Sequence, residues 1–146
     1  MTIPDFEFDG TLPVGIHVCT LEEVASRYGH FGRTDVRLKL TERLRAYVEE
    51  ARRTRVVVWL GIDGSYITRE PEPGDIDLVV ALRADHDFAA EIPPFTYNVV
   101  SRRRVKKLYD FDILAAPEGS AVLATHLEFF QTTRGGKPKG LLKVTL

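Results

Sequence analysis

The chain has 146 residues, enough for one domain with a hydrophobic core of its own. Its apolar content is 44% and its formal net charge is −1, so the overall charge favours neither nucleic acid nor a membrane surface, and any basic site must be local. The single cysteine, Cys19, excludes an internal disulfide. The histidines are too scattered to form a zinc cluster with it: His17, His30, His86 and His126.

The N-terminal segment is acidic and contains Pro4, unlike a signal peptide, and no apolar run approaches the roughly 20 residues that a membrane span needs. We therefore expect a cytoplasmic protein without a membrane partner, built as one domain over residues 1–146. Residues 1–19 are expected to form an extended lead-in, residues 35–132 the core, and residues 133–146 a basic turn and a final strand.

Two helices are predicted in the first third of the chain. Thr20 followed by Glu23 has the pattern of a capping box, which predicts a short helix that Gly29 ends. A longer helix is predicted over 35–53, with Thr34 as its cap, because apolar residues recur there at spacings of three and four. The opposite face of this helix is charged and is expected only to solvate it; its members are Arg37, Lys39, Glu42, Arg43, Glu49 and Arg52.

Two strands are predicted near the middle of the chain. Residues 56–60 form a continuous β-branched and aromatic run, typical of a buried strand, and residues 65–69 can form one helical turn after it. Residues 75–82 are predicted to be the second strand, in which Asp75 and Asp77 point to the same face. Because that face becomes apolar further along, we expect both acids to be partly buried and to have a role.

The second half of the chain alternates between helices and strands. Asp85-His86-Asp87 is interpreted as part of a solvated loop rather than as a ligand set. The elements expected after it are a helix over 96–107, a strand over 109–115, a helix over 121–131 capped by Ser120, and a strand over 141–146. This order predicts an α/β (α+β) domain, with a small mixed β-sheet flanked by helices.

The helix predicted over 96–107 is strongly basic. Five of six consecutive positions are Lys or Arg: Arg102, Arg103, Arg104, Lys106 and Lys107. Such a run extends around most of a helix, so the five charges cannot all face one ligand. It is interpreted either as a solvated face or as a local patch that attracts phosphates or nucleic acid.

The candidate site combines a Gly-Ser pair with acids on strands. Gly64 allows the backbone to approach a ligand closely, and amides after it, together with the Ser65 hydroxyl, can bind phosphate oxygens. Asp75 and Asp77 repel each other unless a cation lies between them, and carboxylate oxygens are the ligands that Mg²⁺ prefers. A third acid, from the next strand, can complete the site and accept a proton.

This pattern resembles the nucleotidyltransferase fold of the polymerase-beta superfamily, whose signature is a hydrophobic residue, Gly-Ser, a spacer, and Asp-x-Asp flanked by hydrophobic residues. Gly64, Ser65, Asp75 and Asp77 match that signature, and Ile76 and Leu78 are its flanking residues. The segments LPVGIH, GSYIT and KPKGLLKVTL are similar to those of a group of small bacterial nucleotidyltransferase-like proteins of unknown function.

The resemblance implies a third metal-binding and catalytic carboxylate on the following strand. Asp112 is favoured for this role and Asp110 is the alternative. If the assignment is right, the carboxylates of Asp75, Asp77 and Asp112 should lie within about 5 Å of one another. Lys137 and Lys139 could neutralise phosphate charge, although a solvated turn is the preferred interpretation for both.

The implied activity is transfer of a nucleotidyl group from a nucleoside triphosphate, with Mg²⁺ or Mn²⁺, to a hydroxyl of a small molecule, a protein or RNA. An alternative is a catalytically reduced binding or regulatory module with a partner protein, as in a toxin–antitoxin or defence system. A metal-dependent nuclease is a third interpretation, and the absence of a compact acid-spacer-Glu-x-Lys pattern counts against it.

Overall fold

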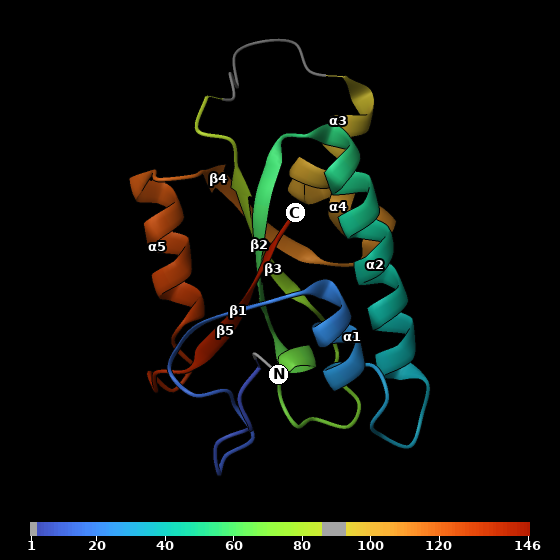
Figure 1. Ribbon diagram of the computed structural model, residues 1–146, viewed down its shortest axis with the longest axis vertical. Coiled ribbons are helices and arrows are strands. Elements are labelled where there is room, and N and C mark those ends of the chain that lie inside the picture. Colours follow the sequence, from blue (N-terminus) through green and yellow to red (C-terminus); the bar gives the residue numbers. More distant parts are fainter. Residues whose placement is uncertain (1–2, 86–92) are drawn as a thin grey trace.

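A computed structural model describes residues 3–85 and 93–146 (Figure 1). Within these ranges the chain forms a mixed sheet with helices on both of its faces, which confirms the α/β prediction. The strands are β1 (Gly15–Cys19), β2 (Val57–Asp63), β3 (Asp77–Leu82), β4 (Asp112–Pro117) and β5 (Gly140–Thr145). The helices are α1 (Leu21–Tyr28), α2 (Val36–Thr54), α3 (Pro94–Val100), α4 (Arg102–Tyr109) and α5 (Ala121–Phe130), with a short 3₁₀ turn at Ser65–Ile67.

The strand order in the sheet is β1-β5-β2-β3-β4. β2 is antiparallel to both of its neighbours, β5 and β3, whereas the outer pairs β1/β5 and β3/β4 are parallel. β1 lies within the segment expected to be an extended lead-in, and it pairs with the last strand of the chain. No helix in the described ranges is both long enough and apolar enough to cross a membrane.

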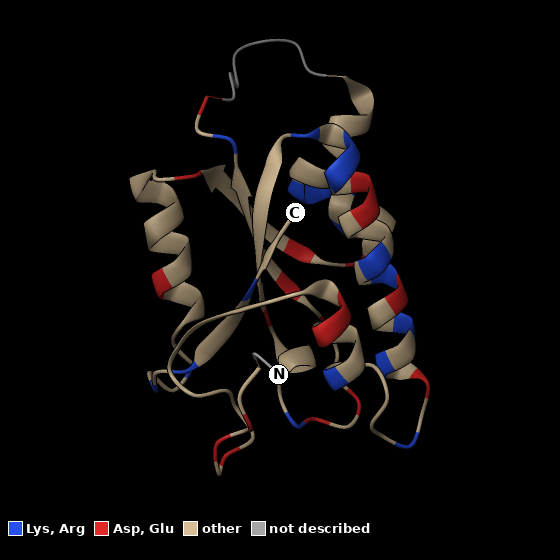
Figure 2. Ribbon diagram, in the orientation of Figure 1, with Lys and Arg blue, Asp and Glu red and all other residues tan. Residues whose placement is uncertain are grey.

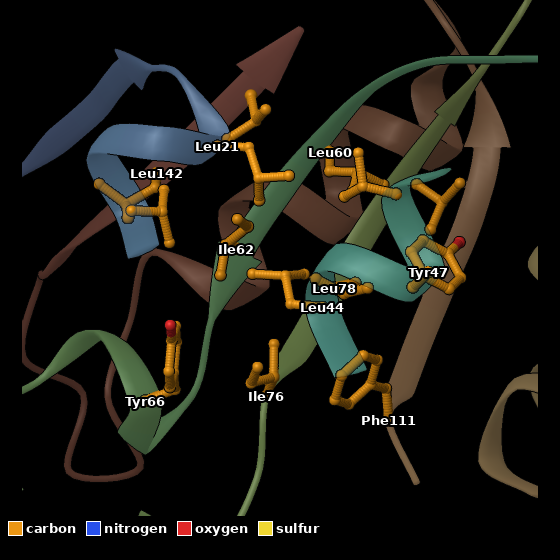
Figure 3. Packing of buried hydrophobic residues seen from close by; sticks show 14 of the residues in the cluster. Leu21, Leu44, Tyr47, Leu60, Ile62, Tyr66, Ile76, Leu78, Phe111 and Leu142 are labelled. Carbon is orange, nitrogen blue, oxygen red and sulfur yellow. The ribbon is translucent and has the colours of Figure 1, made fainter. Parts of the chain in front are cut away.

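Two hydrophobic cores lie on opposite faces of the sheet. The larger core is formed with α1 to α4, and Figure 3 shows Leu44 of α2 packed toward Ile62 and Leu78 of the sheet. The smaller core lies under α5, which packs against β3 and β4 (Figure 1). Because both faces are covered at β2 and β3, these two strands are buried along most of their length, as their apolar runs predict.

Two short-range predictions are confirmed at helix ends. Thr20 and Glu23 form the reciprocal capping box at the start of α1, and Gly29 is its C-cap. Ser120 caps α5 by accepting a hydrogen bond from the Leu123 amide. By contrast, Thr34 is not the N-cap of α2: that position belongs to Asp35, whose side chain makes no capping hydrogen bond.

The helix predicted over 96–107 is two helices. Ser101 has an extended backbone that ends α3, and its hydroxyl accepts a hydrogen bond from the Arg104 amide at the start of α4. The strand predicted over 109–115 also begins later, at Asp112, because Asp110 has a left-handed backbone with φ of 60° and ends α4. The second change determines which acid lies at the sheet edge.

Arg37 corrects the prediction that one face of α2 is merely solvated. Figure 2 shows basic and acidic residues alternating along α2, yet the side chain of Arg37 is buried, with 1% exposure. Its guanidinium donates hydrogen bonds to the carbonyl oxygens of Tyr28, Tyr66, Thr68 and Glu70. A helix residue therefore holds the loop that connects β2 to β3.

Two buried tyrosines allow a matched test of hydroxyl burial. Among the described residues, Tyr28 Oη is buried without a hydrogen-bond partner, whereas Tyr47 Oη donates to the Val99 carbonyl at 2.6 Å. Tyr28→Phe is expected to leave the free energy of unfolding unchanged or raise it by up to about 1 kcal/mol, and Tyr47→Phe to lower it by about 1–2 kcal/mol. Urea denaturation of both variants measures this difference, and equal effects would contradict it.

Candidate functional site

The candidate site lies where the end of β2 meets the starts of β3 and β4. Because β3 is antiparallel to β2 and parallel to β4, these three ends fall at one edge of the sheet. Asp77, the first residue of β3, pairs in register with Asp63 at the end of β2 and with Asp112 at the start of β4. Asp75 precedes β3 by two residues. The sheet thus gathers four carboxylates at one place.

Three of these acids form a compact group. One carboxylate oxygen each from Asp75, Asp77 and Asp112 lies within 4.8 Å of the other two. This agrees with the separation of about 5 Å that the sequence predicts for these carboxylates. Asp75 and Asp77 are half-buried and Asp112 is exposed. Asp110, the alternative third acid, does not belong to this group: it lies at the end of α4, and its carboxylate pairs with Lys106.

The Gly-Ser pair lies directly against this group. Gly64 has a φ of +91°, and a Cβ there would lie 3.1 Å from the Asp77 amide nitrogen and 3.3 Å from Asp75 Oδ1. The Ser65 hydroxyl accepts a hydrogen bond from the Gly74 amide at 3.1 Å and lies 3.4 Å from Asp75 Oδ1. Glycine is therefore required at position 64 both by its backbone conformation and by the space available.

Burial is the main cause that raises the pKa of the Asp77 carboxyl, to about 6. The negative charges of Asp75, Asp63 and Asp112 act in the same direction, and the Lys139 ammonium partly offsets them. The ionised form of Asp77 is thus disfavoured by burial and, to a smaller extent, by the neighbouring acids. A divalent cation beside it would reverse that effect.

The sequence interpretation missed one ion pair beside this group. Asp63 is buried, and its two carboxylate oxygens accept hydrogen bonds from Lys139 Nζ at 2.8 and 2.9 Å. Burial raises the pKa of the Asp63 carboxyl, while the bonds from Lys139 and from the Gly64 amide lower it. The interpretation of Lys139 as part of a solvated turn is therefore wrong, since its side chain is 17% exposed. A signal was available in the sequence: Asp63 ends an apolar strand directly before Gly-Ser.

The other candidate residues are Lys137 and the basic residues of α4, of which Lys106 lies near the acidic group, with its Nζ 3.9 Å from Asp112 Oδ1. The Lys137 side chain is largely exposed and pairs with Asp9. In the basic helix α4, Lys106 pairs with Asp110, and Arg104 donates to the side-chain oxygen of Asn98. His86 and Asp87, which were considered and set aside as ligands, lie outside the described residues.

The donor set suits a hard divalent cation. Mg²⁺ and Mn²⁺ prefer oxygen ligands, and Mg²⁺ is commonly bound by one or two carboxylates together with water and substrate phosphates. Asp75, Asp77 and Asp112 supply three such oxygens with no nitrogen or sulfur donor among them. The backbone of Gly64 packs directly against Asp75 and Asp77, so the Gly-Ser turn adjoins these carboxylates.

Because the pKa of Asp77 is raised, we expect the stability of the metal-free protein to depend on pH. The folded state holds the Asp77 proton more tightly than the unfolded chain does, so this contribution to stability is lost as pH rises from about 4 to 6. As the pH rises over that range, Asp77→Asn should therefore gain about 1–2 kcal/mol of stability relative to the wild type. The gain is smaller than for a fully buried group, because solvent screens the partly exposed carboxylate. Urea denaturation in EDTA at pH 4.5 and 7.5 measures this; identical pH dependence of the two proteins would contradict it.

The fold and the site together define a mixed α/β protein that carries a cluster of three carboxylates beside a Gly-Ser turn at one sheet edge. The chain belongs to a family of unknown function, DUF6932, which matches residues 4–145. No curated protein and no solved structure matches the chain.

Proposed function

We propose that this protein is a nucleotidyltransferase that uses Mg²⁺ or Mn²⁺ to move a nucleotidyl group from a nucleoside triphosphate to a hydroxyl acceptor. The observation that carries the proposal is the group formed by Asp75, Asp77 and Asp112, with oxygens within 4.8 Å of one another beside Gly64 and Ser65. This combination offers oxygen ligands for the cation and a polar backbone surface for phosphates at the same place.

Each part of the site has a role in this reaction. Asp75 and Asp77 would hold the cation, which would stabilise the charge that develops on the phosphate oxygens. The Ser65 hydroxyl and the amides after Gly64 would bind the phosphates of the donor. Asp112 is the most exposed of the three acids, which leaves its carboxylate accessible to an acceptor. It would therefore orient the acceptor hydroxyl and take its proton.

The reaction that these groups support is a single displacement at phosphorus. The acceptor hydroxyl oxygen forms a bond to the α-phosphorus, and the bond from that phosphorus to the oxygen bridging to the β-phosphorus breaks. Pyrophosphate leaves with the electron pair of that bond, and the hydroxyl proton passes to the Asp112 carboxylate. Positioning and charge stabilisation would provide most of the rate enhancement.

Label transfer tests the proposal. The full chain is incubated with α-³²P-labelled nucleoside triphosphates, Mg²⁺ and cell lysate as the source of acceptors, and labelled products are separated by size and by sensitivity to protease and nuclease. We expect label transfer that depends on Mg²⁺ and is lost in the Asp75→Ala/Asp77→Ala double variant. The product analysis then distinguishes a protein, an RNA and a small-molecule acceptor.

The matched control is Glu72→Ala, which removes an exposed carboxylate from the loop just before the site and should keep full label transfer. Circular dichroism confirms that each variant is folded. Transfer that persists in the double variant would refute the metal assignment. If the wild type neither transfers label nor binds nucleotide in the presence of Mg²⁺, the proposal fails, and the alternative of a binding or regulatory module is favoured.

A further inference from the structure

Lys106 lies against the acidic group from the side of α4. Its Nζ is 3.1 Å from Asp110 Oδ1 and 3.9 Å from Asp112 Oδ1. Its position follows from the local fold, because α4 ends at Asp110 and leads directly into β4, which begins with Asp112. The lysine and the third acid of the group are thus brought together by one short stretch of chain.

The two lysines near the site differ in their freedom to move. Lys139 is fixed, since it makes two hydrogen bonds to the buried Asp63 and has a side chain that is 17% exposed. Lys106 has a side chain that is 53% exposed, and its two acidic partners are exposed as well. Exposed ion pairs of this kind contribute little free energy, so the Lys106 ammonium group can separate from Asp112 with only a small loss of stability.

The contact with Asp112 has a consequence for metal binding. A positive charge 3.9 Å from a carboxylate reduces the negative charge that the acidic group offers to a cation. A divalent cation held in the acidic group, next to Asp112, would in turn repel the ammonium group. With four rotatable bonds and an exposed side chain, Lys106 could then turn toward the phosphates that arrive with the cation.

We propose that Lys106 is a substrate-binding residue for the polyphosphate part of the donor: it pairs with Asp112 in the metal-free protein and binds the triphosphate when the divalent cation is present. This proposal rests on the proposed function, and it adds a residue of α4 that the Gly-Ser and Asp-x-Asp pattern does not include. It also gives one residue of the basic run a role at the site. The other basic residues of the run are exposed on α4: Arg102, Arg103, Arg104 and Lys107.

Two binding measurements on the full chain test the proposal. Mn²⁺ is titrated into metal-free protein and followed by electron paramagnetic resonance, and inorganic tripolyphosphate is then titrated by calorimetry at saturating Mn²⁺. Because an exposed ion pair is removed, Lys106→Met should bind Mn²⁺ about two- to fivefold more tightly than the wild type. Because a charge-assisted contact to phosphate is lost, it should bind tripolyphosphate at least about tenfold more weakly.

Two variants serve as controls. Lys107→Met removes the next positive charge of the same exposed helix, and Lys106→Arg keeps the charge at position 106; both should bind Mn²⁺ within about twofold of the wild type. If Lys106→Met behaves like Lys107→Met in both titrations, the role of Lys106 is refuted, while Mn²⁺ binding that Asp75→Ala/Asp77→Ala abolishes still supports the proposed function. If the wild type binds no Mn²⁺, both proposals fail together.

Discussion

Replacing Lys139 by methionine is expected to destabilise the protein by about 3–5 kcal/mol at pH 7.5, because the buried carboxylate of Asp63 then has no counter-ion. The loss is large because Asp75 and Asp77 lie nearby and their negative charges act on the same region. Removal of the ammonium group raises the pKa of Asp63 further, so the carboxyl can accept a proton as the pH falls. The difference from the wild type should therefore shrink toward pH 5.

Urea denaturation at pH 5 and 7.5 measures this effect, and two variants make it specific. Lys137 is an exposed lysine two residues before Lys139 in the same turn. The unfolding midpoint of Lys137→Met should therefore stay close to that of the wild type. The double variant Asp63→Asn/Lys139→Met should recover most of the lost stability, since neither charge of this pair remains. A double variant as unstable as Lys139→Met would show that the ion pair is not the cause.

Replacing Arg37 by methionine is also expected to cost about 3–5 kcal/mol, a large part of the 5–15 kcal/mol that stabilises a typical domain. Methionine approximates the length of the side chain but donates no hydrogen bonds. The carbonyl oxygens of Tyr28 and Tyr66 are bonded inside the core and would lose their donor, whereas those of Thr68 and Glu70 lie closer to solvent and can bind water. The stacking of the guanidinium on Phe31, 3.8 Å from the ring centroid, is lost as well.

The comparison for Arg37 is Arg43→Met, which removes an exposed arginine from the same helix and should change the unfolding free energy by less than about 0.5 kcal/mol. Hydrogen exchange gives a second measurement. Since Arg37 holds the loop between β2 and β3, amides of residues 66–70 should exchange faster in Arg37→Met than in Arg43→Met. Equal stability of the two variants would contradict the role given to Arg37.

The parts of the fold predicted correctly are those whose cause is local. The capping box at Thr20, the cap at Ser120 and the turn after Gly64 each depend on residues within three or four positions. The buried strands β2 and β3 follow from continuous apolar runs. The division between α3 and α4 was missed because Ser101 was taken as part of one continuous helix, although serine favours caps and acts here as one.

The candidate site was predicted in part. The Gly64-Ser65 and Asp75-x-Asp77 pattern located two of its acids and its turn, and Asp112 was the favoured third acid with Asp110 as the alternative. The structure separates these two acids through the backbone: Asp110 ends a helix in a left-handed conformation, whereas Asp112 begins the strand beside Asp77. The strand predicted over 109–115 included both acids, two residues apart.

By itself, the sequence determined the local elements of this protein: the capped helices, the apolar strands, and the presence of acids and a Gly-Ser turn around residues 63–77. Only the tertiary structure decided which charges are buried and what they contact. Arg37 and Lys139 belong to segments predicted to be solvated, and each is buried against partners that include residues tens of positions away in the chain. Such contacts depend on the packing of α2 and on the pairing of β5 with β2, which no local pattern encodes.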